Sequence, residues 1–272
     1  MLAVRDLTKT FPARHDNGAV RALRGVSFDI ADGDFFALLG PSGCGKTTML
    51  QSIAGLETPD SGEIAMGDTV VYASAGGINI PANRRQLGMV FQSYAIWPHM
   101  TVFDNVAFPL REMTDLPEPL IHDIVLMKLN AVGLRGAAGL KISEVSGGMA
   151  RRIALARAIA LDPELIMYDE PFAGLDLISM GVAAKLIRTL NDITGATSLV
   201  VSHDVPECMA ISDHVILMAT QGRIVAQGSP AELMASTDPE VRQFVRGEPD
   251  GPVKFHYPAP SMADDFGLAG TP

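Results

Sequence analysis

Residues 40–48 read Gly-Pro-Ser-Gly-Cys-Gly-Lys-Thr-Thr and carry the clearest chemistry of the chain. Glycine lets the backbone curl so that several N–H groups converge on one point. Such a nest, placed at the N-terminus of a helix, binds phosphate oxygens. The spacing G-x-x-x-x-G-K-[ST] therefore predicts a nucleotide phosphate loop. Its predicted ATP contacts are Gly40, Pro41, Ser42, Gly43, Cys44, Gly45, Lys46, Thr47 and Thr48.

Two side chains of this loop have separate tasks. The Lys46 ammonium adds positive charge where β- and γ-phosphates would lie, and the Thr47 hydroxyl is a ligand for Mg²⁺. The alternative is a glycine-rich turn with an incidental lysine. The apolar strand-like residues 34–39 before the loop and the helical residues 48–54 after it favour nucleotide binding.

Further polar groups follow three other strand-like segments, and Asp169 and Glu170 follow one of them together. A carboxylate at a strand end beside a phosphate loop is a usual partner of Mg²⁺, so Asp169 is a predicted metal ligand. Glu170 points the other way along an extended chain and is the candidate general base for the attacking water. The alternative is a pair of solvated loop carboxylates.

Gln92 and His203 end the other two segments. Their functional interpretation depends on the phosphate loop and the two carboxylates that are predicted nearby. The Gln92 amide oxygen could bind Mg²⁺ or the attacking water, and His203 could hydrogen-bond a γ-phosphate. Alone, they would be a polar strand-end residue and a structural histidine. The predicted metal ligands are Thr47, Gln92 and Asp169, and the predicted catalytic residues are Glu170, His203 and Gln92.

Residues 146–149 read Ser-Gly-Gly-Met and form a second candidate anion site, in front of a helical pattern over residues 150–161. Ser146 is a favourable N-cap, and the two glycines leave backbone N–H groups open. Plain helix capping is the alternative, and physical chemistry alone favours it. Two chains facing head to tail would use one phosphate loop and one spare anion site at each shared ATP.

The elements that must position these residues alternate between strands and helices. This alternation predicts a parallel sheet covered by helices on both faces. Ligands of such sheets bind at the carboxyl ends of strands, where the polar groups fall. Strands are expected at residues 34–39, 87–91, 165–168 and 198–201, and helices at residues 48–54, 103–111, 120–132, 150–161 and 180–191.

Other segments depart from that alternation. The patterns predict strands at residues 4–11 and 22–30 with a polar loop between them, a hairpin at residues 63–72, and a loop at residues 73–86. A second hairpin turning at Gln221 and Gly222, a short helix at residues 239–245 and a tail from residue 247 complete the chain.

Composition bounds the class of protein. The 272 residues carry a formal net charge of −10, which excludes a nucleic-acid binder held by phosphate contacts. Cys44 and Cys208 offer no disulfide framework and suit a reducing compartment. No apolar run approaches the ~18 residues of a membrane helix, and the first residues lack the pattern of a signal peptide.

In combination and order, these motifs resemble those of the ATP-binding cassette (ABC) transporter family. They cover roughly residues 2–235. The matches are Walker A at residues 40–48, the Q-loop at Gln92, the signature at residues 145–149, Walker B with its catalytic glutamate at residues 165–170, the D-loop at residues 174–176 with Asp176, and the H-loop at His203.

The signature departs from the usual L-S-G-G-Q at both ends, with Val145 and Met149. The phosphate-contacting positions Ser146, Gly147 and Gly148 are kept, so the resemblance implies that they contact the ATP of a partner chain, with Met149 as the last residue of this signature site. Phe11 falls where the family has an aromatic residue that stacks on the base, although a strand-end core residue fits the spacing equally well.

The resemblance implies an α/β fold with a P-loop NTPase (RecA-like) core, a mainly parallel sheet, an antiparallel β subdomain and a helical subdomain. Residues 1–92 and 161–246 would form the ATP-binding core with the β subdomain. Residues 93–160 would form the helical signature subdomain, and residues 247–272 a C-terminal tail. The implied activity is ATP hydrolysis with Mg²⁺, coupled to transport.

Below the level of the family, the resemblance is mixed. Residues 30–100 resemble ATPases of iron, polyamine or sugar importers, whereas residues 101–260 resemble the ATPase of bacterial phospholipid-trafficking (maintenance of lipid asymmetry) transporters. The chain also stops at residue 272, without the extra C-terminal regulatory domain common in the sugar and iron group. Phospholipid trafficking is therefore the favoured interpretation, and an importer ATPase is the alternative.

The resemblance implies partners and a location. These are a second copy in an ATP sandwich dimer and integral membrane permease subunits, at the cytoplasmic side of the inner (plasma) membrane. A small regulatory subunit and a lipid-binding or solute-binding protein would fit as well. Trp97 would lie near the groove for the permease or in the helical core.

Two other classes of protein remain for comparison. A soluble ABC protein of translation or repair usually has two cassettes or a coiled-coil insertion, and neither is visible in the sequence. A P-loop kinase or GTPase has no role for residues 146–148, and no N-K-x-D stretch is visible.

Overall fold

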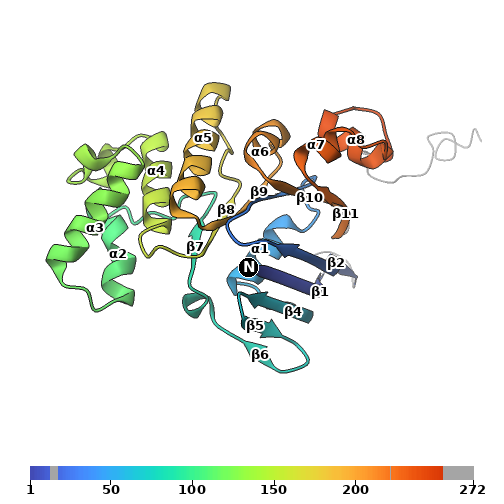
Figure 1. The fold of residues 1–272 in the computed structure, drawn as a ribbon, viewed down its shortest axis with the longest axis horizontal. Helices are drawn as coiled ribbons and strands as arrows, with labels where there is room; N and C mark the ends of the chain where they lie inside the picture. Colours follow the sequence, from blue (N-terminus) through green and yellow to red (C-terminus); the bar gives the residue numbers. More distant parts are fainter. Residues whose placement is uncertain (13–17, 221, 254–272) are drawn as a thin grey trace, which may run out of the picture.

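In the computed structural model, which describes residues 1–12, 18–220 and 222–253, the strands form two sheets (Figure 1). The larger has the order β11-β10-β3-β9-β8-β7, in which the five strands from β10 to β7 are parallel and β11 is antiparallel to β10. Its strands are β3 (Phe35–Leu39), β7 (Leu87–Val90), β8 (Leu165–Asp169), β9 (Thr197–Ser202), β10 (His214–Ala219) and β11 (Arg223–Gly228).

The parallel strands are mostly apolar because both faces of the sheet are covered. Phe35, Ala37 and Leu39 of β3 pack into one hydrophobic cluster, and Phe36 and Leu38 pack into the other. Successive side chains of a strand point to opposite faces, so a strand covered on both sides carries no polar alternation. The continuous apolar runs in the sequence therefore correspond to the interior of the molecule.

The smaller sheet is antiparallel and has the order β2-β1-β4-β5-β6. Part of the predicted loop 73–86 is wrong, because it contains the last of these strands and a 3₁₀ helix at Ala82–Arg84. The strand is two residues long, which is too short for a periodic pattern. The five strands are β1 (Leu2–Pro12), β2 (Ala19–Ile30), β4 (Ser61–Met66), β5 (Thr69–Ala73) and β6 (Ile78–Asn79).

Helices cover both faces of the parallel sheet (Figure 1). Helix α1 lies between the two sheets, and α2 to α4 pack at the β7 side of the molecule. The sequence patterns missed α6 and α7, which are too short for helical periodicity. The helices are α1 (Lys46–Ala54), α2 (Val102–Met113), α3 (Glu118–Ala131), α4 (Gly147–Ala158), α5 (Leu177–Thr194), α6 (Val205–Ile211), α7 (Pro230–Met234) and α8 (Pro239–Arg246).

The helix after the phosphate loop ends where the sequence predicted. Gly55 adopts φ 76° as the C-cap of α1, and its N–H donates to the carbonyls of Gln51 and Ser52. Buried Arg85 completes this end, because its Nη1 donates to the carbonyls of Ser52 and Ile53 at 2.9 and 2.7 Å. An arginine from the segment predicted as a loop thus satisfies carbonyl groups at the end of α1.

Three expectations involve residues outside those described. The loop between β1 and β2 includes residues 13–17, and the β10–β11 turn includes Gln221. Of the expected tail, only residues 247–253 are described, and the Gln243 side chain forms two hydrogen bonds with the backbone of Val253 there. The ranges given for the core, the helical subdomain and the tail remain predictions.

Candidate functional site

The register of the parallel sheet brings the predicted site residues to one edge. Leu39, which precedes the phosphate loop, pairs with Ser202, which precedes His203. On the other side of β9, Val201 pairs with Asp169 at the end of β8. Parallel strands end at the same edge of a sheet. The phosphate loop, the two carboxylates and the histidine therefore project from three adjacent strands, β3, β9 and β8.

The phosphate loop is closed around the Lys46 side chain. Its Nζ donates to the carbonyls of Gly40 and Pro41 at 2.7 and 3.2 Å, and the residue is buried. Gly45 adopts φ 103° at the N-cap of α1, where a Cβ would lie 2.2 Å from the Ala22 carbonyl oxygen. Glycine is therefore required at this position by both conformation and space.

Asp169 and Thr47 fit a divalent cation. Asp169 is 9% exposed, and its Oδ1 is buried without a hydrogen-bond partner among the described residues. Burial raises the pKa of the Asp169 carboxyl, and the negative charge of Glu170 adds to this effect, against Lys46 and a hydrogen bond from Thr47. A cation bound by this carboxylate and the Thr47 hydroxyl would offset the cost of burying the charge.

Glu170 and His203 form a pair. His203 Nδ1 lies 2.8 Å from Glu170 Oε2, and because a carboxylate can only accept, Nδ1 is the donor. The His203 backbone N–H donates to the same oxygen at 3.3 Å. Glu170 has φ 47°, a left-handed conformation that costs a non-glycine residue about 1–2 kcal/mol. The backbone conformation and the hydrogen bonds together fix the orientation of this carboxylate.

Gln92 lies two residues beyond Val90, the last residue of β7, so it begins a turn and does not end the strand as predicted. Its side chain is exposed. The following Tyr94 and Ala95 both have positive φ, 62° and 47°. Arg157 of α4 holds them, because its Nη2 and Nη1 donate to their carbonyls at 2.8 and 2.7 Å.

Trp97 follows this turn and packs against the helical segment. Its ring centroid lies 4.3 Å from that of Phe108 in α2, and the Arg157 guanidinium lies 4.9 Å from its ring. The buried Asn105 bonds both the N–H and the carbonyl of Trp97. These contacts support the helical-core interpretation, and the predicted role beside a permease groove stays a prediction.

Ser146 is the N-cap of α4, as predicted, and its Oγ accepts from the Met149 N–H at 3.3 Å. Gly147 and Gly148 are exposed, with open space where a Cβ would lie. Within the described part of the chain, no hydrogen bond joins residues 146–149 to the phosphate loop, Asp169, Glu170 or His203. The site residues therefore fall into two separate groups within one chain.

Asp176 caps the next helix in the chain, α5. Its Oδ1 accepts from the N–H groups of Ile178 and Ser179, both at 3.0 Å. Hydrogen bonds, first of all from the Ser179 hydroxyl, lower the pKa of the Asp176 carboxyl.

Phe11 lies near the end of β1, half-buried, with the Lys9 ammonium 5.0 Å from its ring centroid.

Comparisons with known proteins identify the family. The model of the family described as "ABC transporter" matches residues 23–173. The chain is 54% identical over 242 residues to the "Intermembrane phospholipid transport system ATP-binding protein MlaF" of Escherichia coli K12, covering 86% of each chain. This chain belongs to the ABC transporter family.

Other members of the family are less similar or extend further. The chain is 41% identical over 233 residues to the "Spermidine/putrescine import ATP-binding protein PotA" of Mycoplasma mycoides, covering 86% of this chain and 62% of that one. A solved structure, the "Dimeric structure of a post-hydrolysis state of the ATP-binding cassette MJ0796 bound to ADP and Pi", superposes with a TM-score of 0.72 at 28% identity. That match covers 85% of this chain and 99% of the other.

The ABC family confirms the predicted fold class and the prediction of an ABC-type ATPase. The higher identity to the phospholipid system than to the polyamine importer also agrees with the favoured interpretation of the sequence. Within the described segments, no helix is both long and apolar enough to cross a membrane.

Sequence reasoning missed several residues around the ABC motifs. Ser202 directly follows the strand predicted at residues 198–201 and belongs to no motif, and its hydroxyl contacts Glu170. Arg151 and Arg157 of α4 also lay outside every motif, and their guanidinium groups bond Tyr94, with Arg157 bonding Ala95 as well. An arginine in an amphipathic helix gives no signal of its partner, so these contacts required the structure.

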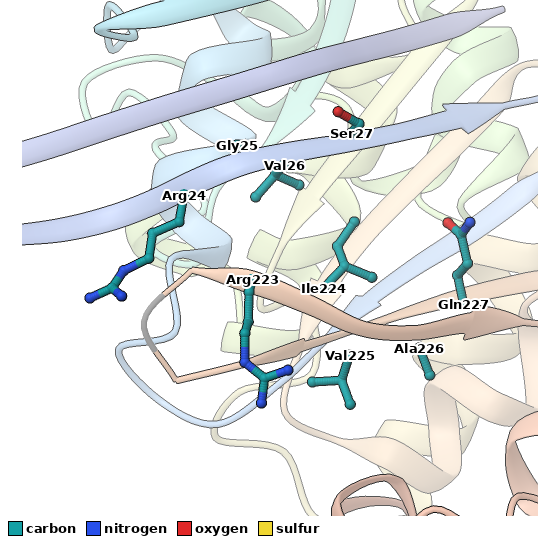
Figure 2. A pocket seen from close by; sticks show the side chains of 9 residues that line it. All are labelled: Arg24, Gly25, Val26, Ser27, Arg223, Ile224, Val225, Ala226 and Gln227. Atoms are coloured by element: carbon teal, nitrogen blue, oxygen red, sulfur yellow. The ribbon is translucent and has the colours of Figure 1, made fainter.

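A separate pocket of about 530 Å³ lies between the edge strands of the two sheets, β2 and β11 (Figure 2). Figure 2 shows Arg24 and Arg223 at one end and Ser27 and Gln227 at the other. Arg223 forms an ion pair with Glu240. No residue of the ABC motifs lines this pocket.

Proposed function

We propose that this chain is the ATP-binding and ATP-hydrolysing subunit of an ABC system that moves phospholipid. The observation that carries the chemistry is the Glu170–His203 pair, 2.8 Å apart, beside the phosphate loop. The observation that supports the substrate is the 54% identity to MlaF along 86% of each chain. An ATPase of an iron, polyamine or sugar importer is the alternative.

In this proposal, the phosphate loop holds the triphosphate through its N–H groups and Lys46. Thr47 and Asp169 hold Mg²⁺, with Gln92 as a further ligand. When bound, Mg²⁺ neutralises charge that develops on the phosphate oxygens. Glu170 accepts a proton from the attacking water, and His203 supports the carboxylate and contacts the γ-phosphate.

The second group of residues acts on a partner chain. Ser146, Gly147 and Gly148 stand open at the N-terminus of α4, where helix N–H groups and the dipole favour an anion. Two copies facing head to tail would bring each such site to the ATP of the other copy. Met149 and Asp176 lie beside this interface in the proposal, and Phe11 stacks on the base.

ATP binding would close the two copies, and hydrolysis would reopen them. This cycle would drive integral membrane permease subunits from the cytoplasmic side of the inner membrane. A small regulatory subunit and a lipid-binding protein would complete a phospholipid system. Trp97, which contacts Phe108 and Arg157, lies in the sequence between Gln92 and the helical segment that would contact the permease.

Two experiments test the proposal. Phosphate release by the Glu170→Gln variant should fall by at least about a hundredfold while ATP binding persists, because the amide cannot accept the proton. Unchanged phosphate release would remove Glu170 as the base.

For the substrate, the complex would be purified from native membranes. Recovery of a permease with bound phospholipid supports the proposal, and recovery of a periplasmic solute receptor supports the importer.

A further inference from the structure

Ser202 stands between two carboxylates at the edge of the parallel sheet. It is the last residue of β9 and is 0% exposed. Its Oγ lies 3.0 Å from Glu170 Oε2 and 3.1 Å from Asp204 Oδ2, and it accepts from the Asp204 N–H at 3.1 Å. The contact with Asp204 N–H is a local turn of a common kind. The contact with Glu170 is not local, since 32 residues separate the two positions.

The three donors to Glu170 all reach the same oxygen. Oε2 accepts from Ser202 Oγ, from the His203 backbone N–H and from His203 Nδ1. No hydrogen bond to Oε1 occurs among the residues that the structure describes. A carboxylate with one oxygen fixed in this way presents the other oxygen in a defined direction.

We propose that Ser202 is a positioning residue for ATP hydrolysis. Its hydroxyl fixes Oε2 of Glu170 so that Oε1 faces the attacking water. The inference rests on the role of Glu170 as general base in the proposed function. The strained backbone of Glu170 sets the direction in which its side chain leaves the main chain, and the hydrogen bond from Ser202 fixes the position of its carboxylate.

The hydroxyl carries one proton for two carboxylates, so Asp204 competes with Glu170 for the same donor. When the proton serves Glu170, three donors hold its Oε2. When the proton serves Asp204, only the two groups of His203 remain on that oxygen. Loss of the hydroxyl should therefore loosen the carboxylate without removing it, and the effect should appear in kcat and not in ATP affinity.

The first test compares Ser202→Thr with Ser202→Val, which have nearly the same shape and differ in the hydroxyl. We expect kcat of Ser202→Val to be roughly tenfold below that of Ser202→Thr, with KM for ATP similar in both. Equal kcat values for the two variants would overturn the proposal.

The second test uses Ser202→Ala in two backgrounds and does not need a branched side chain to fit. Single-turnover phosphate release should fall roughly tenfold when Glu170 is present and less than about twofold in the Glu170→Gln background. An equal fall in both backgrounds, or no fall in the first, would overturn the proposal, because Ser202 would not act through Glu170.

Ser198→Ala is the matched control. Ser198 is also a buried serine on β9, and its Oγ faces Asn191 instead of the site. We expect kcat of Ser198→Ala to match that of the unmodified chain. A loss equal to that of Ser202→Ala would assign the effect to β9 packing and overturn the proposal. If the Glu170→Gln variant instead released phosphate at the rate of the unmodified chain, Glu170 would lose its role in the proposed function.

Discussion

Lys46 has a structural and a chemical role at the same site. Its Nζ bonds the carbonyls of Gly40 and Pro41 and so holds the loop closed. The same ammonium would have to reach the phosphates of a bound nucleotide. Hydrogen-bond partners of this kind offset the cost of burying an ammonium group. The loop is therefore organised around the charge that it offers to the ligand.

Replacing Lys46 by Ala should weaken ATP binding by roughly tenfold to a hundredfold, the value of a hydrogen bond to a charged group. Equilibrium binding of a fluorescent ATP analogue measures this loss. Lys185→Ala, which removes an exposed lysine of α5, is the control and should bind as the unmodified chain does. Equal affinity in all three proteins would exclude Lys46 from the nucleotide site.

The sequence identified residues of this site wherever position along a strand was enough to place them. Asp169, Glu170 and His203 follow apolar strands, and parallel strands bring such ends together. Ser202 could not be found in this way, because a serine beside the end of a predicted strand gives no signal of its partner. Its partner is fixed by the register of β9 against β3 and β8, which the pattern of one segment does not contain.

At the scale of the elements, two arginines join segments that are distant in sequence. Arg85 connects the end of the antiparallel region to the end of α1. Arg157 connects α4 to the turn after Gln92. Neither contact could be predicted, because arginine in a loop or an amphipathic helix is usually solvated.

Arg85→Ala should lower the free energy of unfolding by about 3 kcal/mol, because buried carbonyls of α1 lose their donor. Denaturation by urea measures the difference. The neighbouring Arg84 is exposed, and Arg84→Ala should change stability by less than about 0.5 kcal/mol. If the two variants were equally stable, the cap on α1 would contribute nothing.

Arg157→Ala should release the turn after Gln92. Tyr94 and Ala95 would lose the donors that hold their left-handed conformation, and Trp97 would lose the guanidinium against its ring. Trp97 is the single tryptophan of the chain, so its fluorescence reports directly on this turn. We expect a red shift and faster quenching by iodide in Arg157→Ala.

Arg152→Ala is the control for this experiment. Identical spectra for Arg157→Ala and the unmodified chain would contradict the contact.

At the scale of the whole molecule, the site residues form two groups that no hydrogen bond of the described residues connects. One group lies at the edge of the parallel sheet, and the other stands at the N-terminus of α4. This division is the physical reason to expect a pair of chains. The sequence predicted both groups from local chemistry, and the pairing itself depends on a partner surface that no single chain contains.

Two inactive variants should therefore restore activity when they are mixed. Lys46→Ala weakens ATP binding by the phosphate loop of one copy, and Gly148→Asp places a negative charge at the anion site of the other. The space at Gly148 is open, so the new side chain fits. Each mixed pair would hold one intact site, giving roughly a quarter of the original ATPase rate after random mixing. Gly148→Ala is the control, and a mixture as inactive as its parts would contradict the shared site.

The most direct test is the mass of the Glu170→Gln variant in solution with and without Mg²⁺ and ATP. We expect a dimer that holds two ATP molecules when ATP is present and separates with ADP, since closure needs the γ-phosphate and reopening needs hydrolysis. Lys46→Ala should not dimerise under the same conditions. A mass that does not change between ATP and ADP would contradict the claim that two copies of this chain close over shared ATP.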